Sequence, residues 1–298
     1  MGLKLGSSGL GTGPLSDLPA DAEAQAVAVI DAAYEAGIRF FDTAPFYGRG
    51  VGERRLGVAL ADRPRSEYVL STKVGRSPVA ADGRVRAEFD FSDESVCRSL
   101  DESLFRLGVD AVDIALIHDP DDHWEAAIGE AYPALDELRR QGVVKAIGVG
   151  MNQWQMPARF VREADIDVVL LAGRYSLLDQ SGAELLQLCA ERDVAVIAAG
   201  VFNSGVLAAH EPRGTYNYAQ APPEIIARAR RLATVCERHG VTLPHAALAF
   251  PRQHPAVTSV LFGAESAEEV RRNVALLDSP VPQALWADLA REGLIDRG

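Results

Sequence analysis

The sequence has little basic charge and no long uninterrupted apolar run. Its 298 residues contain 30 Lys and Arg against 42 Asp and Glu, which gives a formal net charge of −12. This balance argues against nucleic-acid binding through a broad basic surface. No window approaches the roughly 20 apolar residues of a membrane span, and the first residues lack the apolar core of a signal peptide. We therefore expect neither nucleic acid nor membrane as a partner.

Cysteine is also scarce. Cys97, Cys189 and Cys236 are odd in number, widely separated and placed in apolar helical contexts. This pattern does not suggest a disulfide framework. It predicts reduced thiols in the core of a cytoplasmic protein.

A repeated pattern of helix, turn residue and short apolar strand runs through the chain. Strands are expected near Leu10 and at 38–41, 68–71, 112–117, 143–149, 167–171, 194–198 and 257–261. Strands that are apolar throughout are buried on both faces, which is typical of a parallel sheet covered by helices. Eight such units, with no linker between them, favour a closed (β/α)8 TIM barrel over a two-domain doubly wound fold. We expect one domain over 1–298.

Two helices and two long connections are clear enough to place. A helix over 21–36 has Asp21 as its candidate N-cap, and a helix over 92–107 has Ser92. The segments 74–91 and 201–223 are too long for ordinary connections and follow strand ends. In a barrel both would lie as long loops at the C-terminal face and form walls of a pocket.

Polar side chains stand at or just after the ends of five successive strands. They are Asp42, Lys73, His118, Asn152 and Tyr175, the last preceded by Arg174. Each alone is commonly a cap or a solvent-exposed residue. Because the ends of parallel strands meet at one rim, we expect these groups to converge there.

Three of these residues, Asp42, Lys73 and His118, suit proton transfer together with Tyr47. Tyr47 follows Asp42 by five residues, and a tyrosine normally titrates near pH 10, too high for a general base at neutral pH. We expect the ammonium of Lys73 to lower that pKa, and Asp42 to hold the lysine in place. A neutral His118 would orient a substrate oxygen. The set fits proton transfer at an alcohol or carbonyl oxygen while a cofactor accepts or donates hydride at the adjacent carbon.

Two other patterns are weak. The run 9–13 (GLGTG) lacks the G-x-G-x-x-G spacing of a dinucleotide fingerprint. The run 118–123 (HDPDDH) holds metal-ligand residue types, but Asp42 and Lys73 complement it poorly. We expect no metal centre.

Several segments carry a resemblance to the aldo-keto reductases. They are the run 37–44 (GIRFFDTA) with Tyr47-Gly48, then Ser71-Thr72-Lys73, Ile117-His118 and the run 148–152 (GVGMN). By these motifs the chain is identified as a member of that family along nearly its whole length. The resemblance implies a barrel that binds a nicotinamide cofactor at its C-terminal rim. It also implies that Tyr47 is the acid/base, that Lys73 and Asp42 tune it, and that His118 orients the substrate.

Further segments, 98–104, 116–121, 171–180 and 202–207, resemble one branch of the family. That branch holds aldose 1-dehydrogenases for L-fucose, D-threo-aldose and L-galactose, together with pyridoxal 4-dehydrogenase. It implies oxidation of a ring hemiacetal hydroxyl to a lactone, with Tyr47 accepting the hydroxyl proton. An aldehyde or ketone reductase, a pyridoxal 4-dehydrogenase and a non-catalytic cofactor-binding subunit are the alternatives.

The resemblance also implies a set of cofactor contacts. They are Gly11, Thr12, Asn152, Tyr175, Phe202, Asn203, Ser204, Gly205, Gly263, Ser266, Glu269 and Asn273. Family members that hold the NADP 2′-phosphate have Lys and Arg at the positions of Gly263 and Glu269. A carboxylate repels that phosphate and can accept hydrogen bonds from ribose hydroxyls. We therefore expect NAD to be preferred, with NADP possible because of Arg271 and Arg272.

Substrate contacts are expected from residues beside the four catalytic candidates. Phe46 and Asp119 adjoin Tyr47 and His118, and Trp124 and Trp154 follow the fourth and fifth strands. The two tryptophans either line a sugar site or pack in the core. The substrate is expected to be a small sugar or aldehyde.

Overall fold

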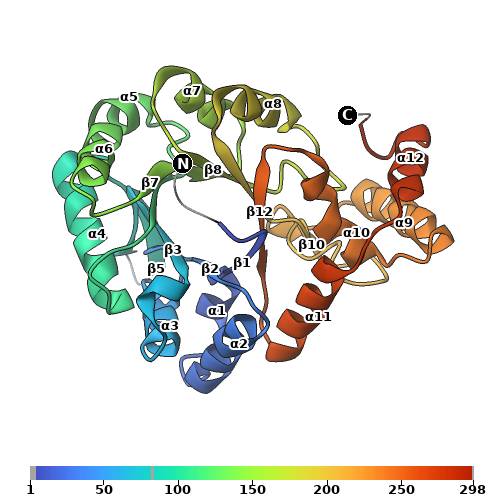
Figure 1. The fold of residues 1–298 in the computed structure, drawn as a ribbon, viewed down its shortest axis with the longest axis horizontal. Coiled ribbons are helices and arrows are strands. Elements are labelled where there is room, and N and C mark those ends of the chain that lie inside the picture. The colour runs from blue at the N-terminus through green and yellow to red at the C-terminus, as the bar shows by residue number, and fades with distance from the viewer. Residues whose placement is uncertain (1–4, 82–83, 297–298) are drawn as a thin grey trace.

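The protein is a closed barrel of eight parallel strands surrounded by helices (Figure 1). The computed structural model describes residues 5–81 and 84–296. Around the barrel the order is β1-β12-β9-β8-β7-β6-β3-β2, and β1 pairs with both β12 and β2 to close it. The strands are β1 Ser8–Gly11, β2 Phe40–Asp42, β3 Val69–Val74, β6 Ile114–His118, β7 Ala146–Met151, β8 Val168–Ala172, β9 Ala195–Ala199 and β12 Val257–Gly263. The predicted (β/α)8 barrel is confirmed.

Helices cover the outside of the barrel, where their apolar faces meet the outward-facing strand residues. The longer ones are α2 Glu23–Glu35, α3 Val51–Leu60, α4 Asp93–Leu107, α6 Tyr132–Arg140, α7 Gln155–Glu163, α8 Ala183–Arg192, α9 Pro223–Arg238, α11 Ala267–Asp278 and α12 Gln283–Arg291. Shorter ones are α1 Gly13–Asp17, α5 Trp124–Ala126, η2 Ala127–Ala131 and α10 Leu243–Ala249, with single 3₁₀ turns at η1 Arg65–Glu67 and η3 Phe250–Gln253. A separate core cluster lies between α9, α10 and α12 on one side of the barrel.

Local sequence explains the helix boundaries in part. Ser92 caps α4 as predicted, because its side chain accepts a hydrogen bond from the N–H of Ser95. The prediction for Asp21 was wrong: α2 begins at Glu23 and its N-cap is Ala22, which makes no side-chain cap. The apolar face of this helix is buried at Ala26, Val29, Ile30, Ala33 and Tyr34.

The inside of the barrel holds a second apolar layer of alternate strand residues. It contains Phe40, Ile114, Leu116, Ala146, Val168, Leu170, Ile197, Ala199 and Leu261. Successive side chains in a strand point to opposite faces, so the inward row continues at every second residue. That period places Asp42 after Phe40 on β2 and His118 after Leu116 on β6. The strand ends therefore turn the apolar interior into a polar rim.

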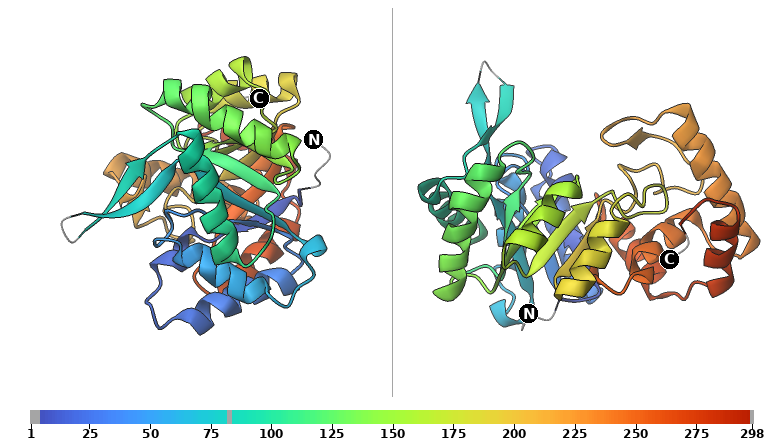
Figure 2. Two further views of the ribbon diagram at one scale, coloured as in Figure 1. Left: turned by 90° about the vertical axis from the view of Figure 1, so that its left-hand side faces the viewer. Right: turned by 90° about the horizontal axis from the view of Figure 1, so that it is seen from above.

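The two long segments contain more structure than loops. The first holds a β-hairpin, β4 Arg76–Ala81 and β5 Arg84–Phe89, which projects from the barrel (Figure 2). The second holds only the short pair β10 Thr215–Tyr216 and β11 Ala219–Gln220. Both stand out on the same side of the molecule, opposite the start of the chain in the right-hand view. Both segments follow strand ends at the C-terminal face, as expected, and the hairpin in 74–91 is a feature that the sequence analysis did not place.

Candidate active site

A buried ion pair lies at the centre of the polar rim. Lys73 is an inward residue of β3, not a residue after the strand as predicted, because β3 runs to Val74. Its ammonium donates to Oδ1 of Asp42 at 2.7 Å and to the carbonyl of Thr43 at 2.8 Å. Both charged residues are 1% exposed.

Tyr47 and His118 complete the group of four. The ammonium of Lys73 donates to the Tyr47 hydroxyl at 3.2 Å and lies 4.7 Å from the centre of its ring. The rings of Tyr47 and His118 meet edge to face, with centroids 6.1 Å apart. The structure thus brings together all four residues that the sequence singled out for proton transfer.

Burial controls the protonation of this group. It opposes the charge of Lys73, but attraction to Asp42 and Tyr47 outweighs that effect and raises the pKa of Lys73. Burial, with the charges of Lys73 and Arg76, lowers the pKa of His118 well below its usual value. At neutral pH the lysine is charged and the imidazole is neutral.

The expected pKa of Tyr47 was wrong in direction. Burial raises it above its usual value, and the opposing effect of Lys73 is smaller. The expectation considered the nearby ammonium and left out desolvation, which the sequence does not display. In this state the phenol is protonated at neutral pH and suited to donate a proton.

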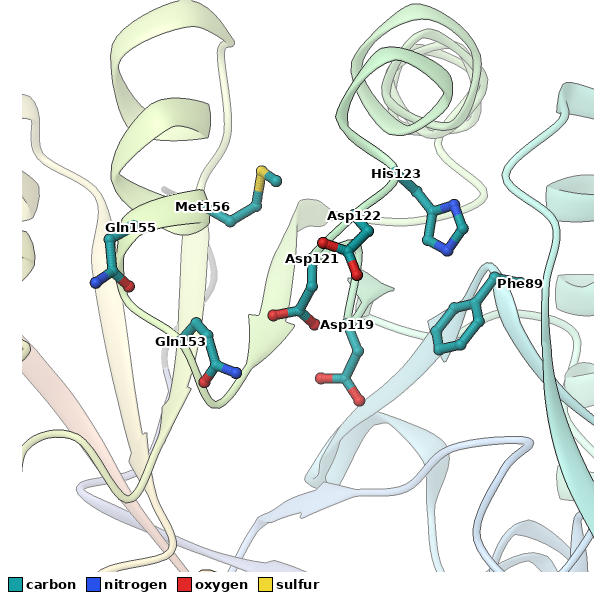
Figure 3. A pocket seen from close by; sticks show the side chains of 8 residues that line it. All are labelled: Phe89, Asp119, Asp121, Asp122, His123, Gln153, Gln155 and Met156. Carbon is teal, nitrogen blue, oxygen red and sulfur yellow. The ribbon is translucent and has the colours of Figure 1, made fainter.

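A polar pocket opens between the ends of β6 and β7, next to these residues (Figure 3). Its volume is about 600 Å³. It is lined by Phe89, Asp119, Asp121, Asp122, His123, Gln153, Gln155 and Met156. Such a wall of carboxylates and amides can accept and donate several hydrogen bonds to a polyhydroxylated molecule.

Of the four residues expected to contact substrate, one lines the pocket and the others pack against protein side chains. Asp119 lines the pocket, and the ring of Phe46 lies against the guanidinium of Arg76 at 3.8 Å. Trp124 is buried against Phe160, so its contacts are those of the packing alternative. Trp154 is partly buried against the main core. Neither tryptophan is among the described residues that line the pocket.

The residues expected to bind cofactor occupy the remaining arc of the rim. Gly11 and Thr12 end β1, Asn152 follows β7, Tyr175 follows β8, Phe202, Asn203, Ser204 and Gly205 follow β9, and Gly263 ends β12. Ser266 is the N-cap of α11, Glu269 lies in its first turn and Asn273 in its middle. The strands β7, β8, β9, β12 and β1 are consecutive neighbours, and β2, β3 and β6, which carry Asp42, Lys73 and His118, fill the rest of the barrel.

This arc fits a dinucleotide. The N-terminus of α11 adjoins the end of β12, and a helix N-terminus offers N–H donors and positive potential to phosphate groups. Residues 203, 204 and 205 form a left-handed run with φ of 47°, 59° and 104°. The Asn203 side chain bonds to Ser176 and Gly173, and its backbone N–H donates to the carbonyl of Gly200, so these contacts of Asn203 hold the loop in shape.

Three of the cofactor-tail residues have structural roles as well. Ser266 caps α11 by accepting from the N–H of Glu269, and the Glu269 carboxylate accepts from the N–H of Glu265 at 2.9 Å. Gly263 packs on Pro14, because an added Cβ would lie 2.6 Å from Pro14 Cγ. The identities of Ser266, Glu269 and Gly263 therefore have structural reasons besides the choice of cofactor.

Sequence reasoning missed Arg76 and the aromatic cluster at the base of the hairpin. Phe89 and Phe91 pack with His123, at centroid distances of 5.0 and 5.4 Å from its ring. The dipeptide Asp82-Gly83, typical of a two-residue hairpin turn, was the available signal for the hairpin. The thiol expectation also needs correction: Cys189 and Cys236 are buried, but Cys97 is partly exposed on α4.

Neither a metal site nor a membrane-spanning helix is found among the described residues. No group of three or more His, Cys, Asp or Glu side chains in the described part of the chain is arranged to hold a metal ion. Within residues 5–81 and 84–296, no helix is long and apolar enough to cross a membrane.

Comparison with known proteins agrees with the fold. The family described as "Aldo/keto reductase family" matches residues 3–291. D-threo-aldose 1-dehydrogenase from Pseudomonas sp and pyridoxal 4-dehydrogenase from Microbacterium luteolum are each 42% identical, over 99% of this chain and 96% of theirs. L-galactose dehydrogenase from Arabidopsis thaliana is 33% identical over 92% of this chain and 85% of its own. A glycerol dehydrogenase structure from Gluconobacter oxydans, at 22% identity, covers 100% of this chain and 95% of its own with a TM-score of 0.81.

The buried ion pair gives a stability prediction. Lys73→Met leaves the Asp42 carboxylate buried without its counter-charge, which should lower the free energy of unfolding by about 3–5 kcal/mol. Urea denaturation measures this, and adding Asp42→Asn should recover part of the loss. Arg98→Met removes an exposed ion pair with Glu94 on α4 and should cost less than about 1 kcal/mol. A similar small loss for Lys73→Met would show that the pair does not stabilise the fold.

Proposed function

The chain belongs to the aldo/keto reductase family and is an oxidoreductase that uses a nicotinamide cofactor on small-molecule substrates, and from that premise we propose that it oxidises an aldose at C1. The substrate is an L-fucose-like sugar in its ring form, and the product is the lactone. The observation that carries the proposal is the Asp42–Lys73–Tyr47–His118 group beside a pocket lined by carboxylates and amides. Such a lining suits the hydroxyls of a sugar better than an apolar carbonyl compound.

The mechanism assigns one task to each of the four residues. When bound, the nicotinamide cofactor supplies the hydride acceptor. Neutral His118 donates a hydrogen bond to the C1 oxygen and orients it. The Tyr47 phenolate accepts the proton of the C1 hydroxyl as hydride leaves C1 and the C=O of the lactone forms. Lys73 stabilises the phenolate, and Asp42 holds Lys73 charged and in place.

A second candidate has support of its own. The 42% identical relative named pyridoxal 4-dehydrogenase matches over the same share of the chain as the aldose enzyme. Phe89 and His123 on one side of the pocket could stack on a flat heteroaromatic ring. A reductase that forms alcohols, and a barrel that only binds cofactor, are the remaining alternatives.

The decisive experiment is a screen of free aldoses and pyridoxal with NAD and with NADP. We expect reduction of NAD with L-fucose-like aldoses and a lactone product, measured by absorbance of the reduced cofactor and by NMR of the product. Turnover of pyridoxal alone would replace the sugar by the second candidate. Cofactor binding without turnover of any alcohol or carbonyl compound would support the non-catalytic alternative.

Tyr47→Phe should abolish hydride transfer and leave cofactor binding nearly unchanged, because the hydroxyl acts only in the chemical step. Since the pKa of Tyr47 is raised, the phenolate fraction grows with pH throughout the neutral and alkaline range. In the wild type, kcat/KM for oxidation should therefore rise by up to about tenfold per pH unit where chemistry limits the rate. Fluorescence titration of the Tyr47→Phe variant with cofactor provides the binding control. Near-normal turnover by Tyr47→Phe would remove this residue from its proposed role.

NAD is proposed as the preferred cofactor because of the carboxylate of Glu269. Glu269→Arg should raise kcat/KM with NADP relative to NAD, since it replaces a charge that repels the 2′-phosphate by one that attracts it. Glu269→Gln is the matched control, because the amide can still accept from the Glu265 N–H without a charge. An unchanged NADP to NAD ratio in Glu269→Arg would place specificity elsewhere.

A further inference from the structure

Arg76 ties the projecting hairpin to the rim of the barrel. It is the first residue of β4, and its guanidinium forms an ion pair with Oδ2 of Asp119. The same guanidinium lies over the ring of Phe46, 3.8 Å from the centroid, and 5.8 Å from that of Phe89. One side chain thus joins β4, the turn after β2 and the end of β6.

The carboxylate that Arg76 engages is also the nearest acid to His118. Asp119 follows His118 directly, and its backbone has the left-handed φ of 46°. Its Oδ2, the oxygen that accepts from Arg76, lies 3.7 Å from Nε2 of His118. One carboxylate oxygen therefore has two possible partners, a permanent cation and a titratable imidazole.

We propose that Arg76 is a positioning residue for His118: by engaging Asp119 it keeps this carboxylate from becoming the ion-pair partner of the imidazole. The inference rests on the proposed role of His118 as a neutral hydrogen-bond donor to the substrate oxygen. A carboxylate released from Arg76 would take the Nε2 proton as a hydrogen bond and favour the charged imidazolium. The imidazole would then be directed at Asp119 instead of at substrate.

The other charged groups around His118 do not replace Arg76. Lys73 on β3 repels a second positive charge and is engaged with Asp42 on β2. Tyr47, in the turn after β2, meets the imidazole through its ring edge. Asp121 and Asp122 line the pocket beyond Asp119. Loss of Arg76 would remove a repelling cation and free an attracting anion, and both changes favour imidazolium.

The test is an NMR titration of His118 in the cofactor-free protein. The signal is assigned by its loss in His118→Gln. We expect the wild-type imidazole to stay neutral over the pH range of the folded protein, with its titration midpoint below that range, and the midpoint of Arg76→Gln to rise into it. Adding Asp119→Asn to Arg76→Gln should bring the midpoint down again. Arg98→Gln, which removes an exposed arginine on α4, is the matched control and should change nothing.

Two results would overturn the proposal: an unchanged midpoint in Arg76→Gln, or a double variant that titrates no lower than the single one. If Arg76→Gln does not fold, Asp119→Asn alone gives an independent check. Removing the carboxylate should not raise the His118 midpoint above that of the wild type. In active enzyme, Arg76→Gln should also lose kcat/KM at acid pH with the midpoint seen by NMR. The titration needs no turnover, so a failure of the proposed function would be seen separately.

Discussion

The buried pair of Lys73 and Asp42 is the interaction on which the rim depends. Two charges that are 1% exposed persist in a barrel only because each has the other, together with the carbonyl of Thr43. The pair fixes the ammonium under the Tyr47 hydroxyl and places a permanent positive charge near His118. The ion pair thus supports Tyr47 when the phenol loses its proton, and it adds to the burial that keeps the imidazole neutral.

Burial acts on these groups in a consistent direction. It disfavours charge on Tyr47 and on His118, and only Lys73 has enough opposite charge nearby to remain ionised. The site is therefore arranged as one buried ion pair beside two groups that burial keeps neutral. Arg76 and Asp119 form a second ion pair at the pocket side. Its carboxylate lies beside His118, whose proposed role requires a neutral imidazole.

The strand period explains why so much of the fold and site could be predicted from the sequence. Alternate residues on β2 and β6 lead from apolar interior positions to Asp42 and His118, so reading which polar residue ends each apolar run was sufficient. The same method failed where contacts come from segments distant in sequence. The hairpin, the link from Arg76 to Asp119 and the desolvation of Tyr47 depend on packing that local pattern does not encode. Glu269 was read for its charge alone, whereas its contact with the Glu265 N–H appears only in three dimensions.

The residues expected to bind cofactor and the residues that line the pocket come mostly from different parts of the rim, so the pocket lining can vary separately. Five consecutive strands form the arc that fits a dinucleotide, while the pocket lining comes from the ends of β6 and β7 and from the hairpin. Asp121, Asp122, Gln153 and Phe89 lie on connections that can change without disturbing Lys73 and Asp42. Arg76 is different, because it belongs to the hairpin and yet acts on the carboxylate next to His118. A hairpin that shapes the pocket is in this way coupled to the protonation of the catalytic rim.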